Sequence, residues 1–291
     1  MKVAILGPRE NVLSRTTKRL REEGEKIFGK IDSIPLIDVK LRIDDKCEAF
    51  YKGKKLSEYD YILPRIDSKR IEMGYPIMKF LDLTDVKKPY RAGTILIAHN
   101  KFLTLYELVK RGIRVPETFM TGSRESASEI LEREKFPTII KLLAGFGGQA
   151  VMILESADAA KSVVETMKIL KQEMLIERFI ENPGEDIRAM VAGDEVIASF
   201  KRIAAPGEKK ANIKLGGRGQ LFHLNAEMKE TALKSAEAIG ARICAIDMIE
   251  GKDGIYVIEA NINPGLSGIE KATDMNVAQK IMSYVHGELK K

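Results

Sequence analysis

The most constraining feature of this sequence is a pair of acidic residues, Asp247 and Glu259, set within two apolar stretches near its end. The glycine-bounded turn between the stretches predicts a β-hairpin. If Gly251 pairs with Ile255, Asp247 lies opposite Glu259 in the hairpin. Asn261 then shares the face of Glu259, because side chains alternate between the two faces along a strand.

Two carboxylates that face each other on apolar strands repel, so this pair needs a positive partner. A divalent cation is one solution. Two carboxylates and an amide are hard oxygen ligands of the kind that Mg²⁺ takes together with waters and substrate phosphates. Two other interpretations of the hairpin stay open: acids on an edge strand that point to solvent, or one acid paired with a nearby arginine.

A glycine-rich loop at residues 143–149 follows a predicted strand that ends in Lys141. Gly145, Gly147 and Gly148 would let backbone N–H groups approach a phosphate, and Lys141 would add a point charge. The loop matches neither common glycine-rich phosphate fingerprint, and a strand rather than a helix is predicted to follow it. An ordinary turn between two strands is the alternative interpretation.

Cationic and amide side chains gather in one region of the last third of the chain. Such a set can clamp anionic groups, and a solvated loop is the alternative. Binding to nucleic acid is not favoured, because that usually adds stacking aromatics and only Phe200 and Phe222 flank the region. The set consists of Lys201, Arg202, Lys209, Lys210, Asn212, Lys214 and Arg218.

Composition excludes several classes of protein. The 291 residues include 48 lysines and arginines against 42 aspartates and glutamates, a net charge of +6 that favours anionic partners. No apolar run approaches the roughly 18–20 residues of a membrane span, and the first residues turn polar too soon for a signal peptide. Cys47 and Cys244 lie far apart, so no disulfide framework is expected and the chain is predicted to be cytoplasmic.

The order of predicted elements indicates an α/β domain followed by an α+β region. Strands at 3–6, 34–39 and 61–63 surround a helix at 14–25 that Ser14 caps, and this domain is expected to end near residues 95–100. Later helices are predicted at 102–111, 123–134, 157–171 and 226–239. Later strands are predicted at 115–120, 136–141, 151–154, 174–179, 186–192, 195–202, 243–249 and 255–261.

Taken in this order, these features resemble the ATP-grasp ligases of the RimK type, which include the α-L-glutamate ligases. The resemblance covers residues 95–280 and is carried by the stretches 136–143, 186–194 and 259–270, and by Asn212 with Gly216 and Gly217. It implies an ATP-grasp fold, α/β and α+β in class. The implied parts are an N-terminal α/β (pre-ATP-grasp) domain at 1–97, a central subdomain at 98–180 and a C-terminal subdomain with the metal site at 181–291.

The resemblance also implies roles for individual residues, which fall into three groups. Those implied to bind the nucleotide are Lys101, Lys141, Gly145, Gly147, Gly148, Glu177, Arg178, Phe179, Asp186, Lys201, Lys210 and Asn212. Among these, Lys101 and Lys141 would touch the phosphates, and Glu177, Arg178 and Phe179 would hold adenine through backbone groups. The implied ligands of Mg²⁺ or Mn²⁺, with two ions expected, are Asp247, Glu259 and Asn261. The implied catalytic residues, beside the γ-phosphate and the acceptor carboxylate, are Arg188 and Arg202.

The implied enzyme is an ATP-dependent carboxylate–amine ligase. ATP would phosphorylate an acceptor carboxylate, and the amine of L-glutamate would then displace phosphate and form an amide. The first expected acceptor is the glutamyl tail of a coenzyme such as tetrahydromethanopterin, bound beside Arg65. A deazaflavin coenzyme, a ribosomal-protein tail and the amino-group carrier protein of lysine biosynthesis are alternatives. The resemblance also implies a homo-oligomer, either a dimer or a tetramer. A non-catalytic nucleotide- or RNA-binding protein of the same fold is the alternative from another class.

Overall fold

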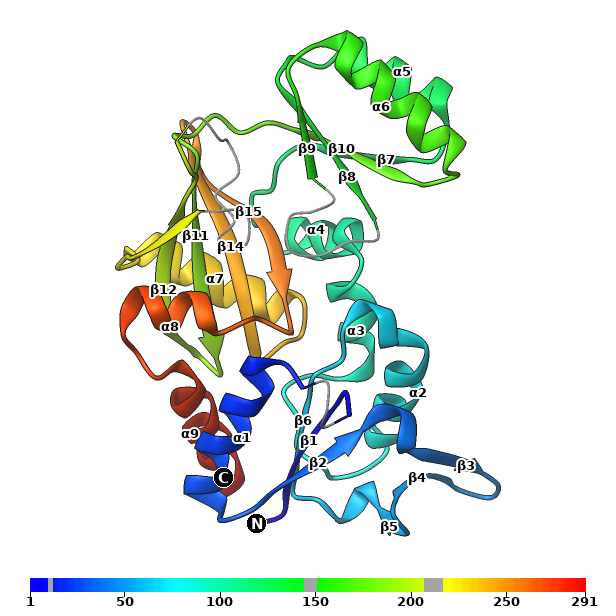
Figure 1. Ribbon diagram of the computed structural model, residues 1–291, viewed down its shortest axis with the longest axis vertical. Helices are drawn as coiled ribbons and strands as arrows, with labels where there is room; N and C mark the ends of the chain where they lie inside the picture. The colour runs from blue at the N-terminus through cyan, green and yellow to red at the C-terminus, as the bar shows by residue number, and fades with distance from the viewer. Residues whose placement is uncertain (10–12, 144–150, 207–216) are drawn as a thin grey trace.

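The computed structural model describes residues 1–9, 13–143, 151–206 and 217–291. Three sheet-containing layers follow one another along the long axis of the molecule (Figure 1). The first domain lies at one end, a five-stranded sheet formed by the last third of the chain lies in the middle, and the central third forms the other end. The two chain termini lie near each other in the first domain.

A parallel sheet in the order β2-β1-β6 forms the centre of the first domain, and β1 is buried along its whole length. Helix α1 begins where the sequence predicts it, after Ser14, whose hydroxyl accepts a hydrogen bond of 3.2 Å from the Thr17 N–H. The strands of this domain are β1 (Val3–Gly7), β2 (Ile31–Pro35), β3 (Lys40–Ile43), β4 (Cys47–Tyr51), β5 (Lys54–Lys55) and β6 (Tyr61–Pro64). Its helices are α1 (Arg15–Phe28), α2 (Ile71–Leu81) and α3 (Ala92–Ala98), with 3₁₀ turns at Leu36–Asp38, Leu56–Glu58 and Ser68–Arg70.

The predicted strand at 34–39 is wrong beyond its first two residues. β2 ends at Pro35, and Leu36–Asp38 forms a 3₁₀ turn. Proline has no backbone N–H to continue a ladder, so the chain leaves the sheet there. Leu36 is nevertheless buried, and its apolar character is what suggested a longer strand.

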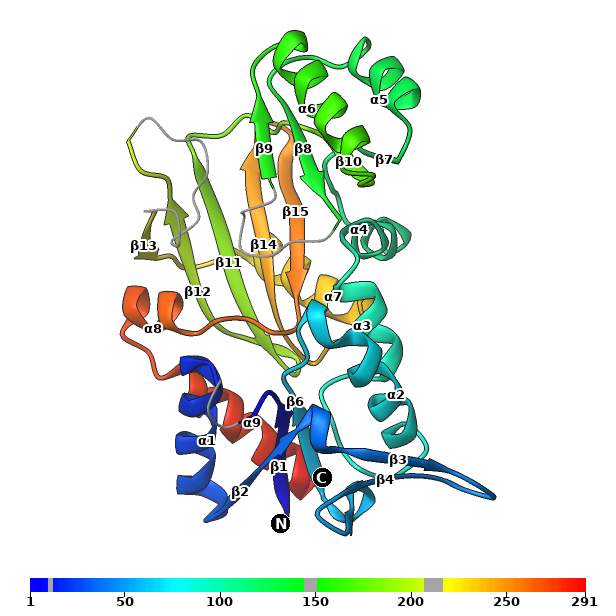
Figure 2. The same cartoon turned by 45° about the vertical axis from the view of Figure 1, so that its right-hand side comes forward.

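The central third forms an antiparallel sheet in the order β7-β10-β8-β9, which packs against α5 and α6 (Figure 2). Its core is separate from that of the rest of the molecule and includes Ile140, Leu154, Val164 and Ile176. The elements are α4 (Lys101–Lys110), β7 (Thr118–Thr121), α5 (Arg124–Leu131), β8 (Thr138–Leu142), β9 (Val151–Leu154), α6 (Ala157–Ile169) and β10 (Met174–Arg178).

The last third forms an antiparallel sheet in the order β13-β12-β11-β14-β15. Its core is continuous with that of the first domain, because Leu6 and Ile62 belong to the same buried cluster as Ile246 and Val257. The strands are β11 (Glu185–Ala192), β12 (Glu195–Ile203), β13 (Arg218–Leu221), β14 (Ile243–Gly251) and β15 (Gly254–Asn261). The helices are α7 (Ala226–Ala238), α8 (Ser267–Thr273) and α9 (Val277–Lys290).

Helices α1 and α9 pack side by side, although one is near the start of the chain and the other is at its end (Figure 1). Gly24 allows this approach, since a Cβ at that position would lie 2.8 Å from the Met282 side chain. Phe28 and His286 add an edge-on ring contact with centroids 5.6 Å apart. The first domain is therefore anchored to the elements that follow the hairpin.

Candidate functional site

The predicted alignment of Asp247 with Glu259 across the β14–β15 hairpin is confirmed, although the turn pairing behind the prediction is wrong. Gly251 pairs with Gly254 rather than with Ile255. A bulge next to Asp247 then shifts the register by one residue and brings Asp247 opposite Glu259. Asn261 lies two residues after Glu259 and therefore on the same face of β15.

Asp247 is 1% exposed and forms ion pairs with two arginines. Arg188 lies directly opposite it on β11 and donates bonds of 2.6 Å from Nε and from Nη2 to the two carboxylate oxygens. Arg202 on β12 donates a further bond of 2.7 Å from Nη2 to Oδ2. Burial alone would raise the pKa of Asp247, but the two guanidinium groups outweigh it and lower the pKa to about 2. The alternative in which an arginine pairs with one acid therefore applies to Asp247.

Asp186 extends this cluster on the side of β12. It lies directly opposite Arg202, and the Arg202 Nε donates a short hydrogen bond to its carboxylate. Burial raises the pKa of Asp186 to about 6, with Arg202 opposing the rise and Asp247 adding to it. Two arginines and two aspartates thus alternate in a buried network, which holds both guanidinium groups in fixed positions.

Glu259 and Asn261 differ from Asp247 in what surrounds them. Both side chains are half-buried, and within the described part of the chain the Glu259 side chain forms no hydrogen bond or ion pair. The Asn261 Oδ1 accepts a bond of 2.8 Å from the Asn263 N–H, which leaves the oxygen one lone pair. The donor set fits a hard divalent cation, since it offers an unpaired carboxylate, an amide oxygen and an Asp247 carboxylate that the arginines hold in place.

Lys141 lies on β8 and pairs with Glu177 on the neighbouring strand β10. The Lys141 Nζ donates bonds of 2.6 and 2.7 Å to the two Glu177 oxygens, and Glu177 is 2% exposed. Lys101, the first residue of α4, lies near both Glu259 and Lys141. Burial lowers the pKa of Lys101, Lys141 acts in the same direction, and Glu259 opposes the change. The structure therefore brings Lys101 within electrostatic reach of Glu259 and of Lys141.

The residues implied to hold adenine lie where β10 ends. The Glu177 carbonyl accepts a bond of 3.1 Å from Thr138 Oγ1, and the Arg178 N–H donates one of 2.9 Å to the Glu117 carbonyl. The Glu177 carbonyl and the Arg178 N–H, two of the backbone groups implied to hold adenine, are therefore already bonded to neighbouring residues of the central third. Phe179 is the first residue after β10.

Lys201 belongs to a different pair from the Asp247 cluster. Its Nζ donates a bond of 2.5 Å to Glu185 and lies 4.9 Å from the centroid of the Phe222 ring. Sequence reasoning did not single out Glu185, although it lies one position before Asp186. The predicted residues Gly145, Gly147, Gly148, Lys210 and Asn212 lie outside the described residues.

Arg65 follows β6 and joins the first domain to the segment after β15. Its guanidinium donates to the carbonyls of Asn263 (3.5 Å) and Pro264 (3.2 Å), and burial lowers its pKa to about 10. The Ile66 carbonyl accepts bonds from His99 Nε2 (2.9 Å) and from the Asn263 amide. Arg65 therefore braces the segment that follows Asn261. Its place in the acceptor pocket stays a prediction.

Both cysteines are free, and Cys47 is exposed whereas Cys244 is buried. Among the helices of the described residues, none combines the length and the apolar character that crossing a bilayer requires.

Comparisons with known proteins place the chain among ATP-grasp enzymes. Residues 98–285 match the RimK-like ATP-grasp domain, and residues 1–95 match the RimK pre-ATP-grasp domain. A probable alpha-L-glutamate ligase of Shewanella loihica is 34% identical over 293 residues, which cover 100% of this chain and 97% of that protein. A relative of the same name from Vibrio vulnificus is 33% identical with the same coverage.

Solved structures give the same fold at lower identity. The ATP-grasp ligase PsnB, in a complex with a variant of its minimal precursor, Mg and ADP, superposes with a TM-score of 0.78 at 15% identity, over 100% of this chain and 99% of that one. A RimK domain ATP-grasp protein from Sphaerobacter thermophilus has a TM-score of 0.72 at 21% identity, over 98% and 99% of the two chains. These likenesses establish an ATP-grasp fold.

Proposed function

The chain belongs to the RimK-like ATP-grasp family, and from this we propose that it adds L-glutamate to an acceptor that ends in a carboxylate. It is an ATP-dependent ligase. The acceptor we propose first is the glutamyl tail of a coenzyme such as tetrahydromethanopterin. The relatives from Shewanella loihica and Vibrio vulnificus are named probable alpha-L-glutamate ligases, which supports L-glutamate as the incoming amino acid.

The observation that carries the proposal is the row Arg188, Asp247 and Glu259 across β11, β14 and β15. It places a guanidinium, a buried carboxylate and an unpaired carboxylate side by side on one face. A protein that only bound RNA would not need an unpaired carboxylate beside the guanidinium groups that attract phosphate, because a carboxylate without a cation repels phosphate. The row therefore favours a ligase over the non-catalytic alternative.

Asp247, Glu259 and Asn261 are the residues that would hold Mg²⁺ or Mn²⁺. A cation bound there would neutralise charge on the triphosphate during transfer of the γ-phosphoryl group. The Asp247 carboxylate would be shared with the two arginines, which it can do because an ionised carboxylate has about four acceptor sites and accepts three hydrogen bonds here. We propose that a second Mg²⁺ or Mn²⁺ ion binds as well.

The reaction has two steps, each with a charge problem that the chain's own residues address. An oxygen of the acceptor carboxylate attacks the γ-phosphorus and ADP leaves, which forms an acylphosphate. The glutamate amine then attacks the acyl carbon, an amide forms, and phosphate leaves with loss of a proton from nitrogen. Arg188 and Arg202 are already oriented by Asp247 and Asp186, so they can present fixed donors to the anionic groups at no further ordering cost.

Lys101 and Lys141 would bind the phosphates of ATP. Lys141 would share its ammonium with Glu177 and a phosphate oxygen, which its three donor positions permit. Burial around both lysines strengthens their attraction to phosphate, since charges interact more strongly where water is excluded. Excluding water also protects the acylphosphate from hydrolysis.

The experiment that tests the proposal is ADP release from ATP, Mg²⁺ and L-glutamate with a panel of acceptors, followed by mass spectrometry. The panel contains tetrahydromethanopterin-type and deazaflavin coenzymes, a ribosomal-protein tail peptide and the amino-group carrier protein. The proposal predicts acceptor-dependent ADP release and a product heavier by one or more glutamyl residues. Absence of ADP release with every acceptor, together with salt-sensitive RNA binding, would favour the non-catalytic alternative.

A further inference from the structure

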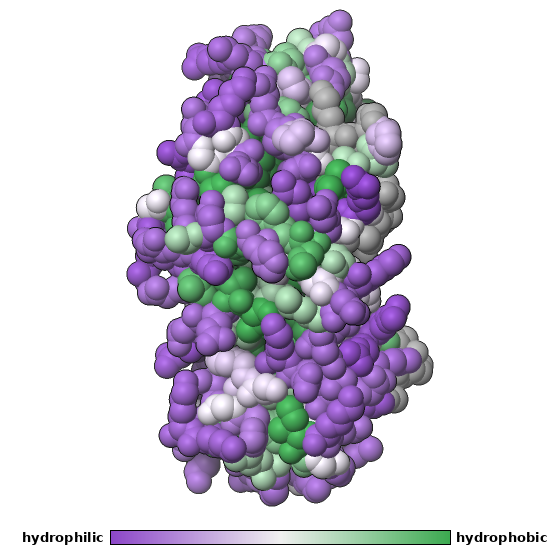
Figure 3. Space-filling view, turned by 90° about the vertical axis from the view of Figure 1, so that its left-hand side faces the viewer, coloured by the Kyte–Doolittle hydropathy of each residue, from purple (hydrophilic) through white to green (hydrophobic). Residues whose placement is uncertain are grey.

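A surface cleft lies away from the row of Arg188, Asp247 and Glu259, between the start of α1 and the start of α8. Its volume is about 580 Å³, and it is lined by Arg15, Arg19, Ser267, Gly268, Glu270 and Lys271. One wall belongs to the first domain, and the other lies in the segment that follows β15. Figure 3 shows the side of the molecule that carries α8 and α9, where hydrophilic side chains surround a hydrophobic area at mid-height.

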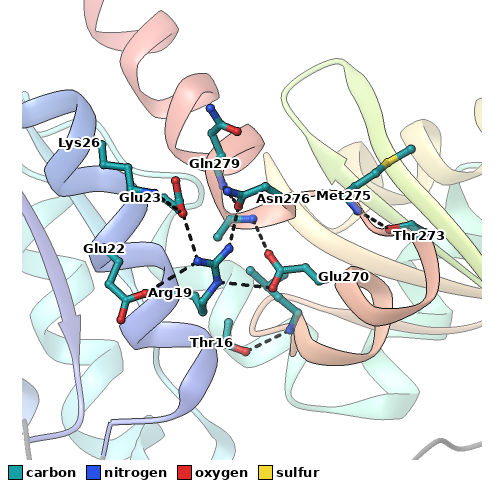
Figure 4. A network of polar contacts seen from close by, with 12 residues as sticks. Thr16, Arg19, Glu22, Glu23, Lys26, Glu270, Thr273, Met275, Asn276 and Gln279 are labelled. Atoms are coloured by element: carbon teal, nitrogen blue, oxygen red, sulfur yellow. Dashed lines mark hydrogen bonds and ion pairs between the residues drawn. The ribbon is translucent and has the colours of Figure 1, made fainter.

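Arg19 fixes the two walls of the cleft relative to each other (Figure 4). Its guanidinium lies 3.1 Å from the Glu23 carboxylate on α1 and 3.7 Å from that of Glu270 on α8, and it donates a 3.0 Å bond to Asn276. Nearby, the Leu266 N–H donates a bond of 3.0 Å to Thr16 Oγ1. The cleft is thus preformed, and Arg19 is already engaged by the carboxylates of Glu22, Glu23 and Glu270.

Arg15 and Lys271 face the same cleft from opposite walls, and both are exposed. Neither side chain forms a hydrogen bond or ion pair with any other described residue. Single unpaired cations are ordinary on a protein surface. These two converge on one preformed cleft. Among the described residues that line it, Arg15, Arg19 and Lys271 outnumber the acid Glu270, so the lining is net positive and an anionic group would satisfy it.

The cleft is connected to the catalytic row by a short, braced segment. Ser267 follows Asn261 by six residues, so the two are at most about 20 Å apart along an extended chain. Arg65 holds the Asn263 and Pro264 carbonyls, and Thr16 holds Leu266. A ligand that spans both places would therefore meet two anion-binding sites at a fixed separation.

We propose that this cleft binds a second carboxylate of the acceptor, distant from the one that reacts, and that Arg15 and Lys271 are the residues that recognise it. The inference rests on the proposed function, since it takes the acceptor to be a chain with several carboxylates. The cleft where the first domain meets α8 would then select which acceptors bind. An acceptor with carboxylates along its length binds both in this cleft and at the row of Arg188, Asp247 and Glu259. An acceptor with a single carboxylate binds only at that row.

The test is isothermal titration calorimetry with tetra-L-glutamate as the probe and tetra-L-glutamine as its neutral counterpart, in the absence of ATP. Arg15→Gln and Lys271→Gln each remove one cation from the cleft. We expect each to weaken binding of tetra-L-glutamate about tenfold, the loss expected for one charge-assisted hydrogen bond. Lys18→Gln is the matched control, because Lys18 is an exposed cation on α1 that does not line the cleft, and it should bind as the unaltered protein does.

Equal binding by the unaltered protein and both cleft variants would overturn the proposal, and so would the absence of measurable binding of tetra-L-glutamate. Because the substituted side chains are exposed, the variants should fold normally, which thermal unfolding verifies. Failure of the proposed function is read separately, in the ADP-release panel. If no acceptor supports turnover while binding still depends on Arg15 and Lys271, the ligase proposal fails and the cleft remains an anion site.

Discussion

Arg188 and Asp247 lie directly opposite each other on β11 and β14, joined by two parallel hydrogen bonds of 2.6 Å. Glu259 continues the same row on β15 and has no such partner among the described residues. Of the two carboxylates proposed to bind the metal, that of Asp247 is thus held in place by Arg188, whereas that of Glu259 has no partner among the described residues. This division leads to different expectations for the two acids.

Replacing Glu259 with Gln should remove activity without harming the fold. The substitution removes one negative ligand and breaks no ion pair with the described residues, so we expect turnover to fall about a hundredfold or more while the thermal midpoint stays unchanged. ADP release as a function of Mg²⁺ concentration measures this. Glu250→Gln is the control, an exposed acid on the same hairpin that should keep full activity. Full activity in Glu259→Gln would count against the metal assignment.

Replacing Arg202 with Met should instead destabilise the protein. It leaves Asp186 without its guanidinium partner and removes one of the two from Asp247, and breaking a buried pair in this way costs about 3–5 kcal/mol. Urea unfolding measures the free energy. Arg242→Met, which loses a largely exposed pair with Asp194, should change it by about 1 kcal/mol or less. Equal effects of the two substitutions would contradict the buried network.

Asp186 should make stability fall as pH rises through weakly acidic values. Burial raises its pKa to about 6, so the folded state holds the proton more tightly than the unfolded chain does. The free energy of unfolding should therefore decrease between about pH 4 and pH 6, by at most about 3 kcal/mol. The lowered pKa of Asp247 acts in the opposite sense and only below about pH 4, where stability is lost as pH falls.

The variant Asp186→Asn isolates this contribution, because the amide does not titrate. Urea unfolding at several values between pH 4 and pH 7 should give a shallower decrease for Asp186→Asn than for the unaltered protein. Glu195→Gln, an exposed position on β12, serves as the control. The same slope for Asp186→Asn and the unaltered protein would show that Asp186 keeps an ordinary pKa.

The pair of Lys141 and Glu177 allows stability and ATP binding to be separated. Lys141→Met leaves Glu177 buried without its cation and should destabilise the protein by about 3–5 kcal/mol. In Lys141→Met with Glu177→Gln, most of that loss should be recovered, because the remaining group is neutral. ATP affinity, measured by calorimetry, should be about tenfold weaker in both variants. Recovery of ATP affinity together with stability would exclude a phosphate role for Lys141.

The first domain and the hairpin show which structural features local sequence patterns can predict. Ser14 and the strand 3–6 were located correctly, because a cap and an apolar run are local signals. The sequence also predicts that Asp247 lies opposite Glu259. That prediction assumes a turn in which Gly251 pairs with Ile255, whereas Gly251 pairs with Gly254 in the structure. A bulge depends on how the two strands pack into the sheet, and alternation along one strand does not reveal it.

The partners of the site residues were harder to predict, because they come from distant parts of the chain. Arg188 and Asp247 are 59 positions apart, and Lys141 and Glu177 are 36 apart. These pairs follow from the order β12-β11-β14 and from β8 lying beside β10. Sheet order is set by tertiary packing, and no motif in the sequence encodes it. The cleft at Arg15 and Lys271 was missed for the same reason.

The most direct measurement is a crystal structure of the protein with Mn²⁺ and a non-hydrolysable ATP analogue, with the metal located by its anomalous scattering. We expect an anomalous peak within about 2.0–2.3 Å of oxygens from Asp247, Glu259 and Asn261, bridging to the triphosphate. A nucleotide bound with no peak there, with Glu259 turned to solvent and Asp247 engaged only by its arginines, would contradict the proposed site.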